Sequence, residues 1–238
     1  SISNDVVITD GLIFNIDSND ISVSDKSTWG NGVELYGFDN DENQDNTNGL
    51  YFDGIDDYVA FKSDNTFDDG FTLSFYGIFD KGKILVKQKD NNAGYSCRFG
   101  FENDHFSFNT SKRAANSAWS LDNVNNNGNL ISPSIFKNNE VCYLDLTFTP
   151  SENKFILYKD GKHIDETIVL SEYWNGTDGG KQIFEDSTIN FYLGKWFGGV
   201  GAWDYTKFTL YNTKLYNRSL SPEEIKENYT KTTAYHNN

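Results

Sequence analysis

Short β-prone runs separated by turn-forming residues are the feature that most restricts this chain, and residues 51–61 show it most clearly. Tyr51 and Phe52 supply aromatic bulk that suits a strand, and residues 58–61 resume the same pattern. The residues between them are rich in Asp and Gly, as in a turn. The stretch therefore predicts a strand, a turn and a second strand.

The turn brings the carboxylates of Asp53, Asp56 and Asp57 close together in the sequence. Two interpretations are open. Asp and Gly form ordinary tight turns in which the carboxylates accept hydrogen bonds from backbone N–H groups. Clustered carboxylates in a loop also suit calcium, so a structural calcium held by these residues is the second interpretation.

Apolar side chains alternate with others along residues 71–79, where Phe71, Leu73 and Phe75 fall on one face. This period of two predicts a strand that turns one face to a core. Asp160-Gly161 is the strongest hairpin signal, and residues 80–82 and 102–104 also predict hairpin turns. Further strands are predicted at residues 11–16, 33–38, 83–88, 95–101, 105–108, 141–149, 154–159, 162–168, 189–193 and 208–216.

A single helix is predicted near the end of the chain. Ser221 is suited to the N-cap, Pro222 to the first helical position and Glu224 to the capping box, and Leu220 can staple to Ile225. This helix should run to about residue 229. The sequence thus predicts an all-β fold, a two-sheet antiparallel β-sandwich (jelly roll) with one short C-terminal helix, as a single domain over residues 1–238.

Charge and composition exclude several partners. The formal net charge of −15 repels phosphate backbones and anionic lipid, so we expect no nucleic-acid binding. No apolar run approaches the roughly 18 residues that span a bilayer, so we expect no membrane insertion. The chain has no Met, which predicts a piece excised from a longer protein. Cys97 and Cys142 lie in predicted strands, where either a disulfide or two buried free thiols would suit them.

Several motifs occur in an order that resembles a known family. They are residues 11–14, 50–59, 71–75, 157–162, 192–194 and 214–225. Together they resemble the laminin-G-like, concanavalin A-like lectin-glucanase jelly-roll domains of extracellular, bacterial-surface and phage tail proteins, over nearly the whole chain. The resemblance implies a location outside the cell, at a cell surface or on a virion. It also implies a structural calcium near the Asp53 turn, helped by an acidic residue in the strand where this chain has Tyr211 and Asn212.

The first functional hypothesis is a non-catalytic carbohydrate-binding module, one of the roles that the resemblance implies. Sugars present apolar C–H faces and hydroxyl groups, so their sites combine aromatic platforms with polar loop residues. Trp119, Trp174, Trp196 and Trp203 lie in loop-like stretches rich in such partners, and Asp204 adjoins the last of them. Packing in the core is the alternative for each Trp. Trp196 and Trp203, flanked by Gly, are the better candidates.

Two other classes of function are weighed against the first. A structural or protein–protein adhesion domain, forming a homo-oligomer or binding an assembly partner, fits the acidic, Asn-rich composition equally well. A glycoside hydrolase needs two carboxyl groups about 5 Å apart if it retains configuration. Asp145 is the only carboxylate in residues 141–148, and Asp165 and Glu166 are adjacent and point to opposite faces. We therefore expect no catalytic residues.

Overall fold

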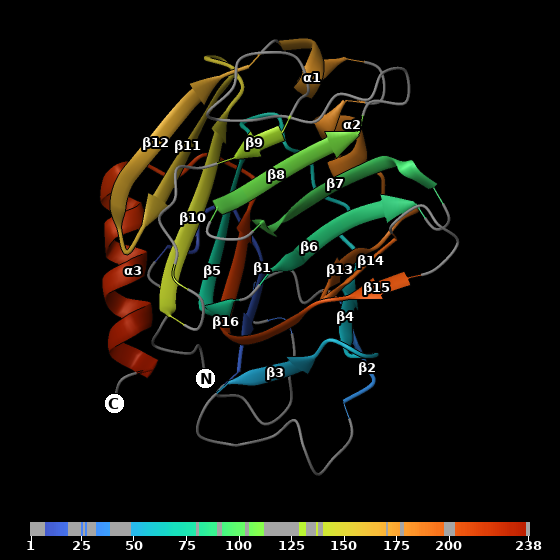
Figure 1. Cartoon of the computed structure of the whole chain (residues 1–238). Coiled ribbons are helices and arrows are strands. Elements are labelled where there is room, and N and C mark those ends of the chain that lie inside the picture. Colours follow the sequence, from blue (N-terminus) through green and yellow to red (C-terminus); the bar gives the residue numbers. More distant parts are fainter. Residues whose placement is uncertain are drawn as a thin grey trace.

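Two antiparallel β-sheets face each other and enclose a core rich in phenylalanine (Figure 1). The fold class predicted from the sequence is confirmed. The structure is a computed structural model. It describes residues 8–18, 25, 27, 32–38, 49–79, 81–89, 92–102, 105–111, 129–131, 137, 140–169, 171–176, 179–197 and 203–236.

Sheet A contains the first strand, the last long strand and the middle of the chain. In spatial order its strands are β1 (Leu12–Asp17), β16 (Lys207–Tyr216), β5 (Phe71–Phe79), β10 (Val141–Thr149), β11 (Lys154–Lys159) and β12 (Lys162–Ile168). The short strand β3 (Leu50–Asp53) pairs with the first half of β16, and β1 pairs with its second half. The ends of the described chain therefore meet in one sheet.

Sheet B forms the opposite layer. In spatial order its strands are β2 (Val33–Tyr36), β4 (Tyr58–Phe61), β13 (Phe191–Leu193), β6 (Gly82–Lys89), β7 (Asn92–Glu102), β8 (His105–Ser111) and β9 (Asn129–Ile131). A separate hairpin, β14 (Lys195–Phe197) and β15 (Trp203–Tyr205), adjoins this sheet (Figure 1). The hairpins predicted between β7 and β8 and between β11 and β12 are confirmed. Asp160 and Gly161 both have positive φ, as a two-residue hairpin requires.

Two predicted turns connect the sheets rather than neighbouring strands. β3 belongs to sheet A and β4 to sheet B, so the turn at Asp53 is a corner between the layers. The predicted hairpin at residues 80–82 is wrong for the same reason, because β5 lies in sheet A and β6 in sheet B. Local sequence signals a reversal of the chain but does not say which strand the chain pairs with next.

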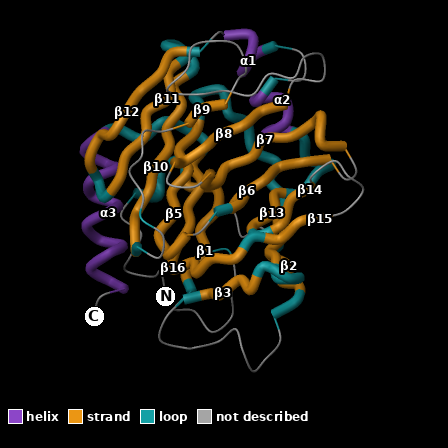
Figure 2. Tube along the Cα trace, in the orientation of Figure 1, coloured by secondary structure: helices purple, strands orange, loops and turns teal. Residues whose placement is uncertain are grey.

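The helices differ from the prediction in length and number. α3 (Pro222–His236) begins with the predicted capping box, in which Ser221 Oγ accepts from the Glu224 N–H and Glu224 accepts from the Ser221 N–H. It extends beyond residue 229 because Thr232, in its later turns, is buried against sheet A (Figure 2). α1 (Ser171–Asn175) and α2 (Gly180–Glu185) were not predicted, and α1 contains Trp174, which the sequence placed in a loop-like stretch. Burial of apolar side chains in these segments stabilises short helices that local propensity does not predict.

The core between the sheets is dominated by aromatic rings. Phe71 lies within 6.3 Å, between ring centroids, of rings from both layers and from α1 and α2. Such rings bury large apolar areas and prefer edge-on and offset-stacked contacts, both of which Phe71 makes. Cys97 in sheet B and Cys142 in sheet A are both buried thiols rather than halves of a disulfide, and burial raises the pKa of Cys142 to about 12. None of the described helices is both long and apolar enough to cross a membrane.

Candidate functional site

The β14–β15 hairpin brings together three of the residues that the sequence singled out for ligand binding. Trp196 pairs directly with Asp204, and Phe197 pairs with Trp203. Both indoles are partly exposed, and Asp204 is exposed. This hairpin therefore offers aromatic surface beside a carboxylate, the combination expected for a sugar site.

Side chains from sheet B hold the hairpin in place. The Gln88 amide accepts from the Phe197 N–H (3.4 Å) and donates to the Phe197 carbonyl (3.2 Å). Arg98 Nη2 donates to the same carbonyl (3.3 Å), and its guanidinium lies 5.3 Å from the Trp196 ring centroid. Burial lowers the pKa of Arg98. A side-chain clamp thus replaces the backbone ladder that would normally attach a strand to a sheet.

An ammonium group lies among aromatic rings next to the hairpin. Lys195 Nζ is 3.9 Å from the ring centroid of Tyr58, 4.3 Å from that of Trp203 and 5.4 Å from that of Tyr192. Tyr36 stacks on Tyr58 with centroids 4.4 Å apart and planes 9° apart. We call these five residues the Lys195 cluster. Cation–π contacts of this kind contribute about 0.5–2 kcal/mol each, depending on desolvation.

Strand alternation explains why these rings gather on one surface. Val59 and Phe61 of β4 point into the core, as do Phe191 and Leu193 of β13. The intervening Tyr192, and Tyr58 at the start of β4, therefore project from the opposite face of sheet B. This alternation was visible in the sequence, but the contact with Lys195 and Trp203 depends on the hairpin folding back across the sheet.

Tyr36 is the ring of the cluster with the most exposed surface. Tyr36 is 41% exposed, and its hydroxyl donates to Glu34 (2.6 Å), a hydrogen bond that raises the pKa of Tyr36. Tyr58 is covered by Tyr36 and by the Lys195 ammonium. A ligand that stacks on the cluster therefore has Tyr36 and Trp203 to contact, rather than Tyr58.

Trp174 does not join this site. Trp174 is only 1% exposed and packs against Phe71, Phe148 and Phe184. Its predicted role as an exposed platform is wrong in this structure, because an indole buried in the core offers no face to a sugar. Trp174 does line a cavity of about 340 Å³, together with Asn175, Gly176, Lys181, Gln182 and Glu185. Trp119 lies outside the described residues.

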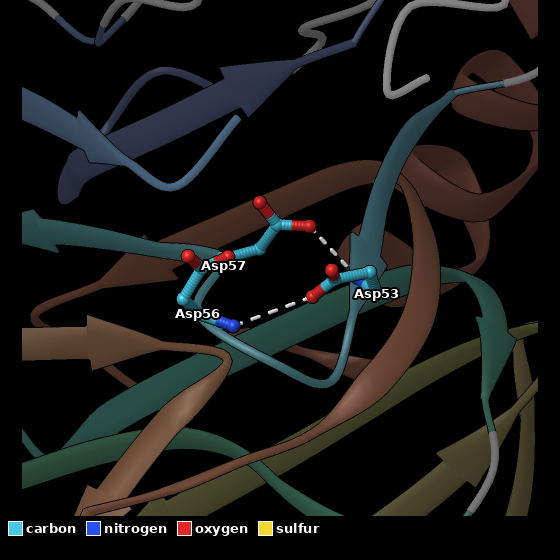
Figure 3. A group of neighbouring side chains, drawn as sticks. All are labelled: Asp53, Asp56 and Asp57. Carbon is cyan, nitrogen blue, oxygen red and sulfur yellow. Dashed lines mark hydrogen bonds between the residues drawn. The ribbon is translucent and has the colours of Figure 1, made fainter. Parts of the chain in front are cut away.

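The Asp53 corner is a hydrogen-bonded turn (Figure 3). Asp53 Oδ1 accepts from the N–H groups of Ile55 (2.6 Å) and Asp56 (3.4 Å), and Asp57 Oδ2 accepts from the Asp53 N–H (2.8 Å). Gly37, at the end of β2, lies against the corner, where a Cβ would be 2.5 Å from the Asp56 carbonyl oxygen. Only glycine allows this approach.

The corner has the charge of a cation site but only part of the expected ligand set. One carboxylate oxygen from each of Asp53, Asp56 and Asp57 lies within 4.8 Å of the others. Burial is the main cause that raises the pKa of Asp57 to about 6, and the neighbouring Asp53 carboxylate adds to it. The residue paired with Asp53 on β16 is the cation Lys207. Asn212 of β16, at a position where the resemblance implies an acidic residue, hydrogen-bonds Asn15 on β1.

Comparison with solved structures identifies a shared fold. A botulinum neurotoxin DC binding domain in complex with rat synaptotagmin II matches with a TM-score of 0.65 and 14% identity, over 95% of this chain and 52% of that chain. A structure of botulinum neurotoxin type C, whose cell entry is described as dependent upon interaction with two ganglioside molecules, matches with a TM-score of 0.65 and 13% identity, over 94% of this chain and 52% of that chain. A neurotoxin DC binding domain in complex with SialylT has a TM-score of 0.62 and 13% identity, over 94% and 52%.

No family model and no curated protein matches the sequence. The chain spans about half the length (52%) of the structures it matches. Identities of 13–14% show the fold alone. The chain therefore has the jelly-roll-like, lectin-type β-sandwich that these receptor-binding domains also contain.

Proposed function

We propose that this chain is a non-catalytic, lectin-like recognition module that binds carbohydrate through the β14–β15 hairpin and the Lys195 cluster. The sequence motifs support the finer assignment to laminin-G-like, concanavalin A-like domains. They also support a location outside the cell, on a cell surface, a virion or a tail fibre.

The observation that carries the proposal is a hairpin that presents partly exposed rings and polar groups on both of its faces, with Trp196 beside Asp204 on one face and Trp203 beside Lys195 on the other. Trp196, Trp203 and Tyr36 supply apolar faces for the C–H side of a sugar. Asp204 and Glu34 supply carboxylates that can accept from sugar hydroxyls. Similar solved structures are described with gangliosides and with SialylT, which supports a glycan as the ligand class.

Binding measured with single substitutions tests the proposal. In a glycan array followed by calorimetry, Trp196→Ala and Trp203→Ala should each weaken binding at least tenfold, because loss of one stacked ring removes about 1.4 kcal/mol or more. Tyr235→Ala is the matched control, since this exposed aromatic residue belongs to α3. Unchanged affinity in both Trp variants would remove the hairpin from the site.

A protein partner is the second candidate, bound at the β2 edge of sheet B next to this surface. Leu35 of β2 is 39% exposed. Ile55, in the Asp53 corner, is 73% exposed, and Gly37, which follows β2, contacts this corner. Exposed apolar side chains close to aromatic ones are typical of protein interfaces. One similar structure is a complex with the protein synaptotagmin II. Light scattering after size exclusion should show a monomer if the glycan proposal is right, whereas an obligate oligomer without glycan affinity favours assembly.

We propose no catalytic role for this surface. Asp145, the carboxylate weighed as a hydrolase residue, is fully buried. Glu34 hydrogen-bonds Tyr36 and is not part of a carboxylate pair among the described strands. Release of reducing sugar from a panel of polysaccharides would contradict this view.

A further inference from the structure

A row of polar side chains crosses sheet A on the face turned away from the sandwich core. Asn15, Lys214, Ser74, Asp145 and Tyr158 are successive partners across β1, β16, β5, β10 and β11. Their neighbours in sequence, including Leu73, Leu144 and Leu215, belong to the core between the sheets. All five polar side chains are nevertheless buried.

Helix α3 covers this row. Lys214 Nζ donates to Thr232 Oγ1 of α3 (2.8 Å), and Asn228 of α3 donates to the Tyr216 hydroxyl (3.0 Å). Figure 2 shows α3 packed along sheet A (purple against orange). A small apolar cluster of Leu12, Tyr158, Tyr216, Leu220 and Ile225 holds the start of the helix. Opening of α3 would therefore admit water to the polar row.

Asp145 is the member of the row whose burial costs free energy that its hydrogen bonds compensate least. Its Oδ1 accepts from the Ser74 hydroxyl, and its Oδ2 has no hydrogen-bond partner among the described residues. An ionised carboxylate with an unsatisfied oxygen is costly in a water-excluded site, whereas a protonated carboxyl is not. The closed interface therefore favours neutral Asp145.

Other ionisable groups face Asp145 from the surrounding strands and from α3. Tyr143, Tyr158 and Tyr216 have pKa values raised by burial, so they stay neutral in neutral and mildly acidic solution. From α3, Tyr229 packs on the Tyr143 ring and His236 Nε2 lies 3.6 Å from Asp17 Oδ1 of β1. Lys214 is the cation of the row, and its charge favours ionised Asp145.

We propose that α3 is a pH-sensitive clasp, which stays closed over Asp145 in mildly acidic solution and opens more often as the solution becomes alkaline. This is independent of the proposed glycan site, which lies on sheet B.

The sign and size of the response follow from linkage. Burial raises the pKa of Asp145 from 3.8 to about 7 in the closed state, despite the opposing effects of Ser74 and Lys214. The stability that neutral Asp145 contributes is complete below the open-state pKa and is lost as the pH rises through the closed-state pKa. If opening returns the carboxyl to its ordinary pKa, the opening constant rises about tenfold between pH 6 and pH 8.

Hydrogen–deuterium exchange of the whole chain tests the proposal. After correction for the intrinsic exchange rate, protection of amides in residues 222–236 should fall about tenfold from pH 6 to pH 8. Asp145→Asn should abolish this change. Asp57→Asn, which removes another carboxyl with a raised pKa, should leave the change in α3 intact. His236→Gln should also leave it intact, which separates the effect of Asp145 from that of the histidine at the end of α3.

Three outcomes would overturn the clasp. They are α3 protection that is constant or higher at pH 8, a pH response that persists in Asp145→Asn, and a response that disappears in His236→Gln. Should Asp145→Asn fail to fold, carbon NMR of the wild-type carboxyl decides the question. A titration of Asp145 above pH 6 supports the clasp, and a titration near the ordinary carboxyl value contradicts it.

Discussion

The Gln88 clamp gives the sharpest test of how the candidate site is built. Gln88 is 1% exposed and makes two hydrogen bonds to the backbone of Phe197. Replacing it with Leu keeps a similar volume but removes both bonds. Arg98 still donates to the Phe197 carbonyl, so the group left without a partner is the Phe197 N–H.

The expected loss of unfolding free energy can be calculated from these contacts. A buried backbone N–H left unsatisfied costs about 1–3 kcal/mol, and the second lost bond adds about 0.5–1.5 kcal/mol. The leucine gains some apolar burial, which offsets part of this. We expect Gln88→Leu to destabilise the protein, or to open the hairpin locally, by about 2 kcal/mol.

Two assays distinguish destabilisation of the whole protein from local opening of the hairpin. Urea denaturation reports the global free energy of unfolding, and hydrogen exchange in residues 194–197 and 203–206 reports local opening. Glycan affinity should fall with the hairpin population. Gln182→Leu is the matched control, because Gln182 belongs to α2 and is exposed. A Gln88→Leu protein with unchanged unfolding free energy and unchanged hairpin exchange would refute the clamp.

Further predictions concern the helix cap and the Asp53 corner. Ser221→Ala should lower the unfolding free energy by about 1 kcal/mol in urea denaturation, because the Glu224 N–H loses its cap; an unchanged midpoint would contradict a structural capping box. Asp57→Asn should raise stability at pH 8 and flatten its pH dependence, because the raised pKa of Asp57 means that its stabilising contribution is lost as the pH rises through about 6; thermal melts from pH 4 to pH 8 measure this, and a wild-type slope in the variant would count against it. A structural calcium at Asp53, Asp56 and Asp57 stays a prediction. If calcium binds there, chelation with EDTA should lower the melting temperature and added calcium should restore it, and an unchanged melting temperature would contradict the metal.

Strands with strong local signals were the most predictable part of the fold. The bounds predicted for β10, β11 and β12 match the structure, because apolar alternation and Asp160-Gly161 act within a few residues. The partners of β3 and β6 were not predictable, since the choice of sheet depends on strands far along the chain. α1 and α2 were missed because tertiary packing, not propensity, stabilises them.

The candidate site was likewise predictable only in part, in its residue types but not in its long-range contacts. The sequence singled out Trp196, Trp203 and Asp204 as residue types suited to sugars, and the hairpin brings them together. It could not place Lys195 over Tyr58, because those residues are far apart in the chain and meet only after the hairpin folds across sheet B. Trp174 shares the Gly-rich, polar surroundings of the others, and only its packing reveals a core residue.

The pairing of β1 with β16 has a consequence for how the protein is made. Leu12 of β1 and Tyr216 of β16 are partners, so sheet A lacks a complete edge until almost the whole described chain has left the ribosome. Contacts so distant in sequence slow folding, because the entropy of closing a long loop is lost before strand pairing can compensate for it. During that interval β5 presents an unpaired apolar edge, where another chain can add a strand. Chains truncated before β16 should therefore aggregate rather than yield a smaller folded sandwich.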